Sequence, residues 1–162
     1  MKIAVFSDTH FCRNEMTEIV ELLKPDMVIH LGDDVSDANA LRDSFPKLTV
    51  VGVAGNSLSD MMSGETRTKC MEFFGYNIMM THGHDYSVKY GLTKLAEAAE
   101  SRDASIALYG HTHIAADEEI KGIRCINPGS MMLRTNGERS YALIEVEKGR
   151  FDCRIMRLKK YI

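Results

Sequence analysis

The chain has 162 residues, and its 20 basic and 23 acidic side chains give a formal net charge of −3. This length is typical of one domain that buries a core without disulfide support. The absence of basic runs and of interleaved basic and aromatic residues argues against tight nucleic-acid binding, and no apolar stretch approaches the roughly 18–20 residues of a membrane span.

Strand-like and helix-like segments alternate along much of the chain, which predicts βαβ units and an α/β fold. Five short apolar runs bounded by turn residues are expected to be buried strands: residues 3–6, 28–31, 50–54, 78–80 and 106–109. Alternating residues predict a further strand at 67–73. Apolar residues at helical spacing predict helices at 16–23, 37–43 and about 91–102.

After residue 114 the pattern changes to short strands separated by Lys-Gly turns. The expected strands are 118–120, 124–126, 141–146 and 151–158. Such turns predict an antiparallel meander, which would supply much of a second sheet packed on the first. We expect residues 1–162 to form a single domain.

Each of the five buried runs ends in Asp, His or Asn next to glycine or a small polar residue. The side chains concerned are Asp8, His10, Asp33, Asn56, His82, His84, His111 and His113. Because ligands of open α/β sheets gather beyond the carboxyl ends of strands, parallel neighbours would bring these residues to one edge. The Asp-x-His and His-x-His spacings would place both side chains of a pair on the same face. The pattern predicts a metal site.

Imidazole and carboxylate together suit divalent transition metals, whereas calcium and magnesium prefer oxygen ligands. No cysteine lies within the five motifs, so a closed structural zinc site is not indicated. The ligands are too many for one ion with an open position but fit two ions that share a carboxylate. Paired metals about 3.5–4 Å apart can clamp a phosphoryl group and generate hydroxide at neutral pH. One such motif alone usually marks a loop or turn; five at the same strand-to-loop transition favour the metal.

The ordered motifs resemble those of the calcineurin-like metallophosphoesterase superfamily. The short chain, with Asn127-Pro128-Gly129-Ser130 after the last motif, is more similar to the YfcE-type bacterial and archaeal phosphodiesterases. The resemblance, which runs from residue 2 to about 157, implies a four-layer αββα sandwich with two mixed β-sheets. It also implies phosphodiester hydrolysis by a two-metal-activated hydroxide. The implied cofactors are two divalent transition-metal ions, manganese first, with nickel, iron, cobalt or zinc as alternatives.

The resemblance also implies a role for each motif residue. The first metal would be held by Asp8, His10 and His113, and the second by Asn56, His82 and His111, with Asp33 bridging. We expect Asp33, Asn56 and His84 to be catalytic, with His84 holding a ligand or touching the phosphate. Substrate contacts are expected from Asn56, His84 and Ser130. The turn that carries Ser130 either presents donors to the site or is simply a tight turn.

Two features depart from the motif pattern. Many superfamily members have His directly after the motif Asn, and YfcE-type members generally have Cys-Asp, but here Ser57-Leu58-Ser59-Asp60 follows Asn56. An efficient general acid is therefore not evident. His30 lies inside an apolar strand, so we expect it to be a satisfied core or interface histidine rather than a ligand.

Two alternative functions stay open. A phosphomonoesterase or nucleotide phosphohydrolase differs mainly in loop shape, although Asp34 and Asp37 would disfavour highly charged monoesters. A non-catalytic scaffold of the retromer-subunit type usually lacks some ligands, and all seven are present here. The expected partner is a small-molecule phosphodiester, and a homo-oligomer is left open. Four widely spaced cysteines and no signal peptide predict free thiols in a reducing cytoplasm.

Overall fold

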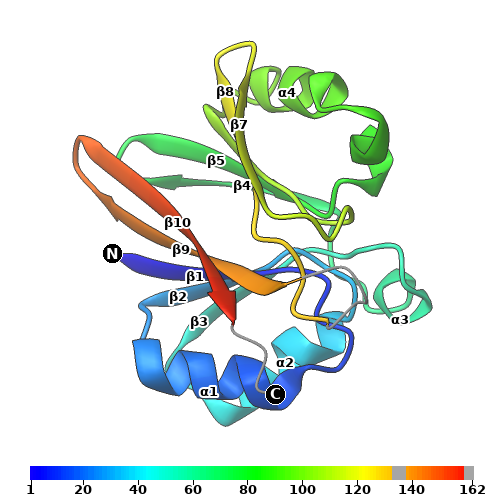
Figure 1. Ribbon diagram of the computed structural model, residues 1–162, viewed down its shortest axis with the longest axis vertical. Helices are drawn as coiled ribbons and strands as arrows, with labels where there is room; N and C mark the ends of the chain where they lie inside the picture. Colours follow the sequence, from blue (N-terminus) through cyan, green and yellow to red (C-terminus); the bar gives the residue numbers. More distant parts are fainter. Residues whose placement is uncertain (133–137, 159–162) are drawn as a thin grey trace.

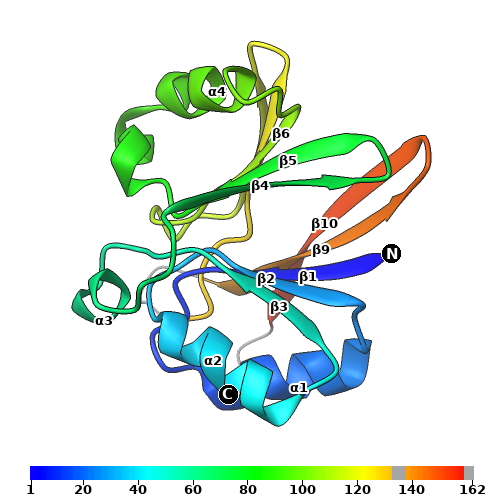
Figure 2. The same ribbon diagram turned by 180° about the vertical axis from the view of Figure 1, so that it is seen from behind.

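The computed structural model describes residues 1–132 and 138–158. Two five-stranded sheets face each other, and helices cover their outer faces (Figures 1 and 2). The strand order is β10-β9-β1-β2-β3 in the first sheet and β4-β5-β6-β8-β7 in the second. Both sheets contain parallel and antiparallel pairs, so the expected four-layer sandwich of two mixed sheets is confirmed.

The first sheet is built on three parallel strands with crossover helices. These elements are β1 (Lys2–Phe6), α1 (Arg13–Leu23), β2 (Met27–His30), α2 (Val35–Ser44) and β3 (Thr49–Gly52). Helix α1 buries Met16, Ile19 and Val20 at the predicted spacing and ends where Lys24 takes a left-handed backbone before Pro25. Helix α2 is longer than predicted and begins at Val35, directly after a site loop.

The second sheet has a parallel centre with antiparallel edges. Its strands are β4 (Thr68–Phe73), β5 (Tyr76–Thr81), β6 (Ile106–Leu108), β7 (Ala116–Ile120) and β8 (Ile123–Asn127). Strands β5, β6 and β8 are parallel, while β4 and β7 pair antiparallel with β5 and β8. Helix α4 (Thr93–Glu100) packs outside, and short turns of helix lie in the loops: α3 (Leu58–Met61), η1 (His84–Tyr86) and η2 (Val88–Tyr90).

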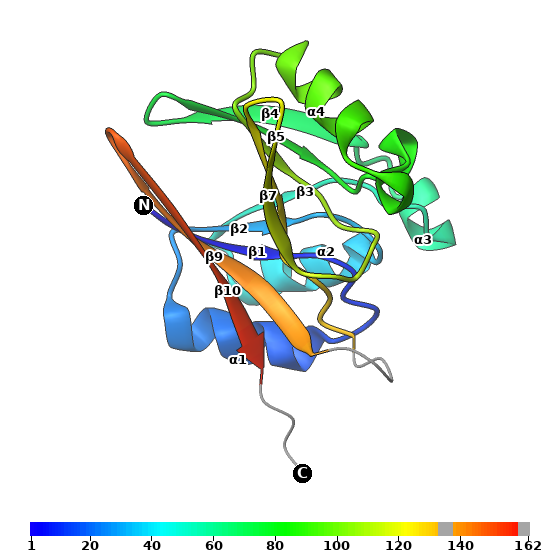
Figure 3. The ribbon, with the colours of Figure 1, turned by 45° about the horizontal axis from the view of Figure 1, so that its top comes forward.

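The expected meander of the last four strands is wrong. Strands β7 and β8 form a hairpin in the second sheet, whereas β9 (Arg139–Glu147) and β10 (Arg150–Leu158) form a hairpin in the first (Figure 3). Strand β9 pairs antiparallel with β1. The Lys-Gly turns determine each hairpin locally but do not determine which sheet the hairpin joins. The chain crosses between the sheets after β8.

The main core fills the space between the sheets. Along β1, Ile3 and Val5 face the second sheet, while Ala4 and Phe6 pack beneath the helices of the first. The second sheet contributes side chains such as Met80 to the same interior. The carboxyl ends of β1 to β3 and of β5 lie at the same end of the molecule (Figure 1). No helix of the described residues has the length and apolar character to cross a membrane.

The expectation for His30 is confirmed, because this side chain is fully buried and its polar atoms have partners. The N–H of Gly32 donates to Nδ1 (3.3 Å), and Nε2 lies 3.0 Å from the hydroxyl of Thr9. That hydroxyl donates in turn to Asp37. Burial lowers the pKa of His30 to about 4, so the ring is neutral at pH 7.

Candidate metal centre

The predicted ligands form two groups with one shared member. Asp8, His10, Asp33 and His113 offer ligand atoms that all lie within 4.8 Å of one another, and so do Asp33, His82 and His111. The amide oxygen of Asn56 lies 3.1 Å from Nε2 of His82, which adds a fourth side chain to the second group. Asp8, His10, Asp33 and Asn56 follow strands of the first sheet, and the other three follow strands of the second.

The loops that carry the ligands have an unusual backbone. Asp8, His10, Asp33, His111 and His113 all have positive φ, between 43° and 68°. Residues other than glycine rarely adopt this conformation, and such positions concentrate at functional sites. The conformation turns the chain sharply at the end of each strand and keeps the ligand beside the sheet edge.

Glycines let these loops approach one another closely. A Cβ on Gly32 would lie 2.5 Å from the backbone nitrogen of Gly55, and one on Gly110 would lie 1.9 Å from Oγ of Ser7. Any larger residue would push the loops apart. The Gly-Asp, Gly-Asn and Gly-His pairs read from the sequence therefore bring the loops together.

Several buried polar atoms in and beside the two groups lack a hydrogen bond. Among the described residues these atoms are Asp8 Oδ1, His10 Nε2, His113 Nδ1 and both ring nitrogens of His84. Two of them lie within ion-pair distance of a neighbour, because Asp8 Oδ1 lies 3.1 Å from Nε2 of His113 and His84 Nε2 lies 3.4 Å from Asp85. Buried polar atoms are nearly always paired, and a bound cation would supply the missing partner. Imidazole, carboxylate and amide donors are the set that divalent transition metals prefer. The residues present therefore fit a metal pair.

Neighbouring groups aim the ligand atoms. The Nδ1–H of His82 donates to the carbonyl of Leu31 (2.7 Å), which directs Nε2 toward Asp33 (3.4 Å) and Asn56. The Oδ2 atom of Asp8 accepts from Ser7 Oγ and from the N–H of His111, which leaves Oδ1 facing the group. Such partners fix the orientation and tautomer of metal ligands.

The electrostatics favour the metal-binding protonation states. Burial alone would raise the pKa of Asp8 and Asp33, but contacts with His113 and His82 outweigh it and hold both values below the usual range. Burial and the nearby charge of His82 lower the pKa of His111 to about 4, so this ring is neutral at pH 7. Ionised carboxylates and neutral imidazoles are the forms that bind metals.

His82 behaves differently without a cation. Burial would lower its pKa, but the contact with Asp33 and the charges of Asp8 and Asp33 raise it. The two carboxylates thus favour protonation of His82, which competes with metal binding at this ring. Because metal binding requires a neutral imidazole, metal affinity should increase with pH.

Two other predicted residues lie beside these groups. His84 is next to the rings of His82 and His111, with centroids 5.5 and 6.1 Å away, and burial lowers its pKa. The Ser130 hydroxyl is buried and donates to the backbone carbonyl of Asp8 (2.8 Å). Asn127, in the same turn, donates to the carbonyl of Gly110. The turn braces the ligand loops, and a substrate contact from Ser130 stays a prediction.

Asp60 is the important residue whose role the sequence did not indicate. Its buried carboxylate accepts four backbone N–H bonds: from Asp33 (2.9 Å), Asp34 (3.1 Å), Val35 (2.8 Å) and Gly55 (2.6 Å). One side chain thereby fixes the loop after β2, the first turn of α2 and the loop after β3. The only available signal was an acidic residue shortly after the Gly-Asn motif.

Replacement of Asp60 by asparagine should therefore destabilise the protein and displace Asp33 and Asn56. The new amide group would face backbone donors, and buried unsatisfied donors cost about 1–3 kcal/mol each, so we expect a loss of about 2–4 kcal/mol. Urea unfolding of the metal-free variant measures this loss. Asp43→Asn, on the exposed face of α2, controls for the charge change. Wild-type stability of Asp60→Asn would contradict the assignment.

Comparison with known proteins agrees with this geometry. The family model for the calcineurin-like phosphoesterase superfamily domain matches residues 1–149. A probable metallophosphoesterase of Mycoplasma pneumoniae is 30% identical over 92% of each chain. A phosphodiesterase of Methanocaldococcus jannaschii is 26% identical over 91% of this chain and 95% of its own.

Solved structures are similar over almost the whole chain. A conserved Streptococcus pneumoniae protein, described as a predicted phosphoesterase, has a TM-score of 0.76 and 27% identity, covering 96% of this chain and 88% of its own. Vps29 of Chaetomium thermophilum has the same TM-score at 16% identity, covering 98% and 95%, a likeness of fold alone. The family match and the relatives show that this chain belongs to the calcineurin-like phosphoesterase superfamily.

Proposed function

We propose that the protein is a phosphodiesterase that works with two divalent transition-metal ions, manganese being the first candidate. The observation that carries this proposal is a complete pair of ligand groups that share Asp33. Bound ions would supply positive charge at the phosphoryl oxygens and make water acidic enough to ionise near neutral pH. Membership of a phosphoesterase superfamily and a relative described as a phosphodiesterase support the same chemistry.

In this proposal each ligand group holds one ion. Asp8, His10 and His113 hold the first, Asn56, His82 and His111 hold the second, and Asp33 lies between them. Among the described residues, the two ring nitrogens of His84 have no hydrogen bond, although Nε2 lies 3.4 Å from Asp85, and the ring lies beside the second group, where it would donate to a phosphoryl oxygen. The side chain of Asn56 is exposed and would contact the substrate as well as an ion.

The surroundings favour a diester over a monoester. Asp34 is buried beside His10 of the first group and adds negative charge that would repel a dianionic monoester more than a monoanionic diester, whereas the charge of Asp37 is paired with Arg13 (2.7 Å). The residues that follow the site motifs are apolar and exposed: Phe11 (70%), Leu58 (76%) and Ile114 (69%). Apolar side chains at this position would accommodate uncharged ester groups.

A non-catalytic scaffold of the Vps29 type would have the same fold as the proposed phosphodiesterase. The likeness to Vps29 concerns the fold alone, and the complete ligand set, six Asp and His residues together with Asn56, favours hydrolysis. A monoesterase would use the same ligands, so the two are separated by substrate. One experiment, which measures metal content and hydrolysis together, distinguishes both alternatives from the proposed activity.

Metal content and hydrolysis, measured on the same purified protein, test the proposal. We expect two manganese ions per chain by elemental analysis, weaker binding as the pH falls, and loss of activity with a chelator. Bis(p-nitrophenyl) phosphate should be cleaved faster than p-nitrophenyl phosphate. Two bound ions with a preference for the monoester would contradict the substrate, and two ions without hydrolysis would favour a scaffold. A single ion would contradict the metal pair.

A further inference from the structure

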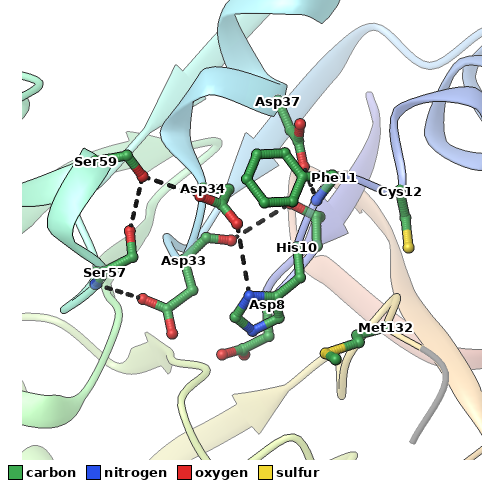
Figure 4. A network of polar contacts seen from close by, with 12 residues as sticks. Asp8, His10, Phe11, Cys12, Asp33, Asp34, Asp37, Ser57, Ser59 and Met132 are labelled. Atoms are coloured by element: carbon green, nitrogen blue, oxygen red, sulfur yellow. Dashed lines mark hydrogen bonds and ion pairs between the residues drawn. The ribbon is translucent and has the colours of Figure 1, made fainter.

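The segment after Asn56 makes polar contacts that reach the opposite ligand group. The hydroxyls of Ser57 and Ser59 lie 3.0 Å apart, and Ser59 donates to Oδ1 of Asp34 (2.9 Å). The other oxygen of Asp34 lies 3.5 Å from Nδ1 of His10. Figure 4 shows this chain of contacts running from the loop after β3 to the loop after β1. It connects a segment next to the second group with a ligand of the first.

Asp34 is held at this place by the backbone. Its side chain is 6% exposed, its φ is 81°, and its own N–H is fixed by Asp60. Among the described residues, His10 is the one ionisable side chain within ion-pair distance of Asp34. A buried carboxylate is costly unless it is paired, and a left-handed non-glycine backbone adds strain. Such a position indicates a role in the neighbouring site.

The orientation of His10 shows what that role is. Because Nδ1 faces Asp34, Nε2 is the nitrogen left to bind an ion in the group formed with Asp8, Asp33 and His113. That Nε2 atom is buried and has no hydrogen-bond partner among the described residues. The ring also stacks on His113, with centroids 5.4 Å apart and planes at 21°. Stacking limits the tilt of the ring, while a carboxylate at Nδ1 selects which nitrogen faces the ion.

We infer that Ser59 and Asp34 are positioning residues that hold His10 for the first metal ion. The inference rests on the proposed two-metal site. The contact between Asp34 and Nδ1 of His10 is an ion pair at 3.5 Å rather than a short hydrogen bond. A carboxylate beside Nδ1 of a ligating histidine favours the tautomer with the proton on that nitrogen and raises the basicity of the ring, and loss of such a partner typically costs 10–100-fold in metal affinity. The segment after Asn56, in which the sequence shows no evident general acid, would therefore help to orient a ligand of the proposed metal pair.

Manganese titration of the metal-free protein by calorimetry tests the inference. Asparagine tolerates the left-handed backbone, so Asp34→Asn keeps the size of the side chain and removes the charge. We expect one of the two ions to bind about 10–100-fold more weakly in this variant, and the other to bind as in the wild type. Ser59→Ala keeps every charge and should weaken the same ion by a smaller factor, because the Asp34 carboxylate loses the hydroxyl that orients it while its backbone stays fixed.

Asp43→Asn is the matched control for net charge, because Asp43 lies on the exposed face of α2, the helix that begins directly after Asp34. The visible spectrum of bound cobalt supplies a second measurement, since its intensity reports coordination geometry. The spectrum should change in Asp34→Asn and Ser59→Ala and stay unchanged in Asp43→Asn. Circular dichroism melting of the metal-free proteins shows that each variant is folded.

The outcomes separate the inference from the proposed function. Two ions with wild-type affinity in both variants would overturn the inference alone. A loss in Asp34→Asn that Ser59→Ala does not share would reduce the effect to charge, and would also overturn it. A wild-type protein that binds fewer than two ions would contradict the proposed function and this inference together.

Discussion

Replacement of Asp33 by alanine should lower phosphodiester hydrolysis more than removal of any other ligand. Asp33 belongs to both ligand groups, so its loss weakens two ion sites and leaves two cations poorly screened from each other. Its Oδ1 atom also accepts the N–H groups of Asn56 (3.0 Å) and Ser57 (3.1 Å), so the second ligand loop would shift. We expect kcat/KM to fall by at least about 10³-fold, the upper range for one preorganised electrostatic group.

Kinetics of a matched set of variants measure this effect. His10→Ala and His113→Ala each remove a ligand of the first group only and should retain more activity than Asp33→Ala. Asp33→Asn keeps an acceptor for the two N–H groups but loses the charge, which separates loop position from charge. If Asp33→Ala kept most of its activity while His10→Ala lost it, the bridging assignment would be wrong.

The second large effect concerns the leaving group. A nitrophenolate leaves as an anion without help, whereas an alkoxide needs a proton or direct metal contact as the bond breaks. The structure argues against three nearby residues as the general acid, namely Asp60, His84 and Ser57. The Asp60 carboxylate is buried and accepts four N–H bonds, and burial lowers the pKa of His84, so that ring is neutral at pH 7. The Ser57 hydroxyl is too weak an acid.

Hydrolysis should therefore slow steeply as the leaving-group pKa rises. General acid catalysis usually contributes about 10²–10⁴-fold, and alkyl diesters should lack that contribution here. A series of aryl and alkyl diesters of graded leaving-group pKa, assayed with saturating manganese, gives the slope. A flat dependence with chemistry shown to be rate-limiting would mean that another residue supplies the proton.

The fold was predictable where local pattern and tertiary structure agree. Apolar runs and helical spacing located β1, β2 and α1, because strands buried on both faces and helices packed on one face leave distinct periodicities. The assignment of β7 to β10 to sheets failed because turn residues determine only local hairpins. Whether β9 pairs with β1 depends on the shared core, which no single segment encodes.

The sequence predicted the ligands of the candidate site better than the residues that hold those ligands in position. Strand-end placement identified the ligands, because each motif carries its own glycine and polar side chain. The sequence showed Asp60 only as an acidic residue after the Gly-Asn motif and Asp34 only as general negative charge. Their contacts depend on the backbone N–H groups of one loop and the imidazole of another, and long-range contacts of this kind have no sequence spacing to reveal them.

The division of the ligands between the sheets has a consequence for folding. Asp8, His10, Asp33 and Asn56 come from the first sheet, while His82, His111 and His113 come from the second. Ions held by the proposed site would cross-link the two halves of the sandwich, and binding to the folded state alone stabilises it by about 4 kcal/mol at 1,000 times Kd. The metals would thus add a cross-link to the hydrogen bonds from His82 to Leu31 and from His111 to Asp8, so their loss should lower the stability of the ligand end while these bonds and the shared apolar core keep the two sheets together.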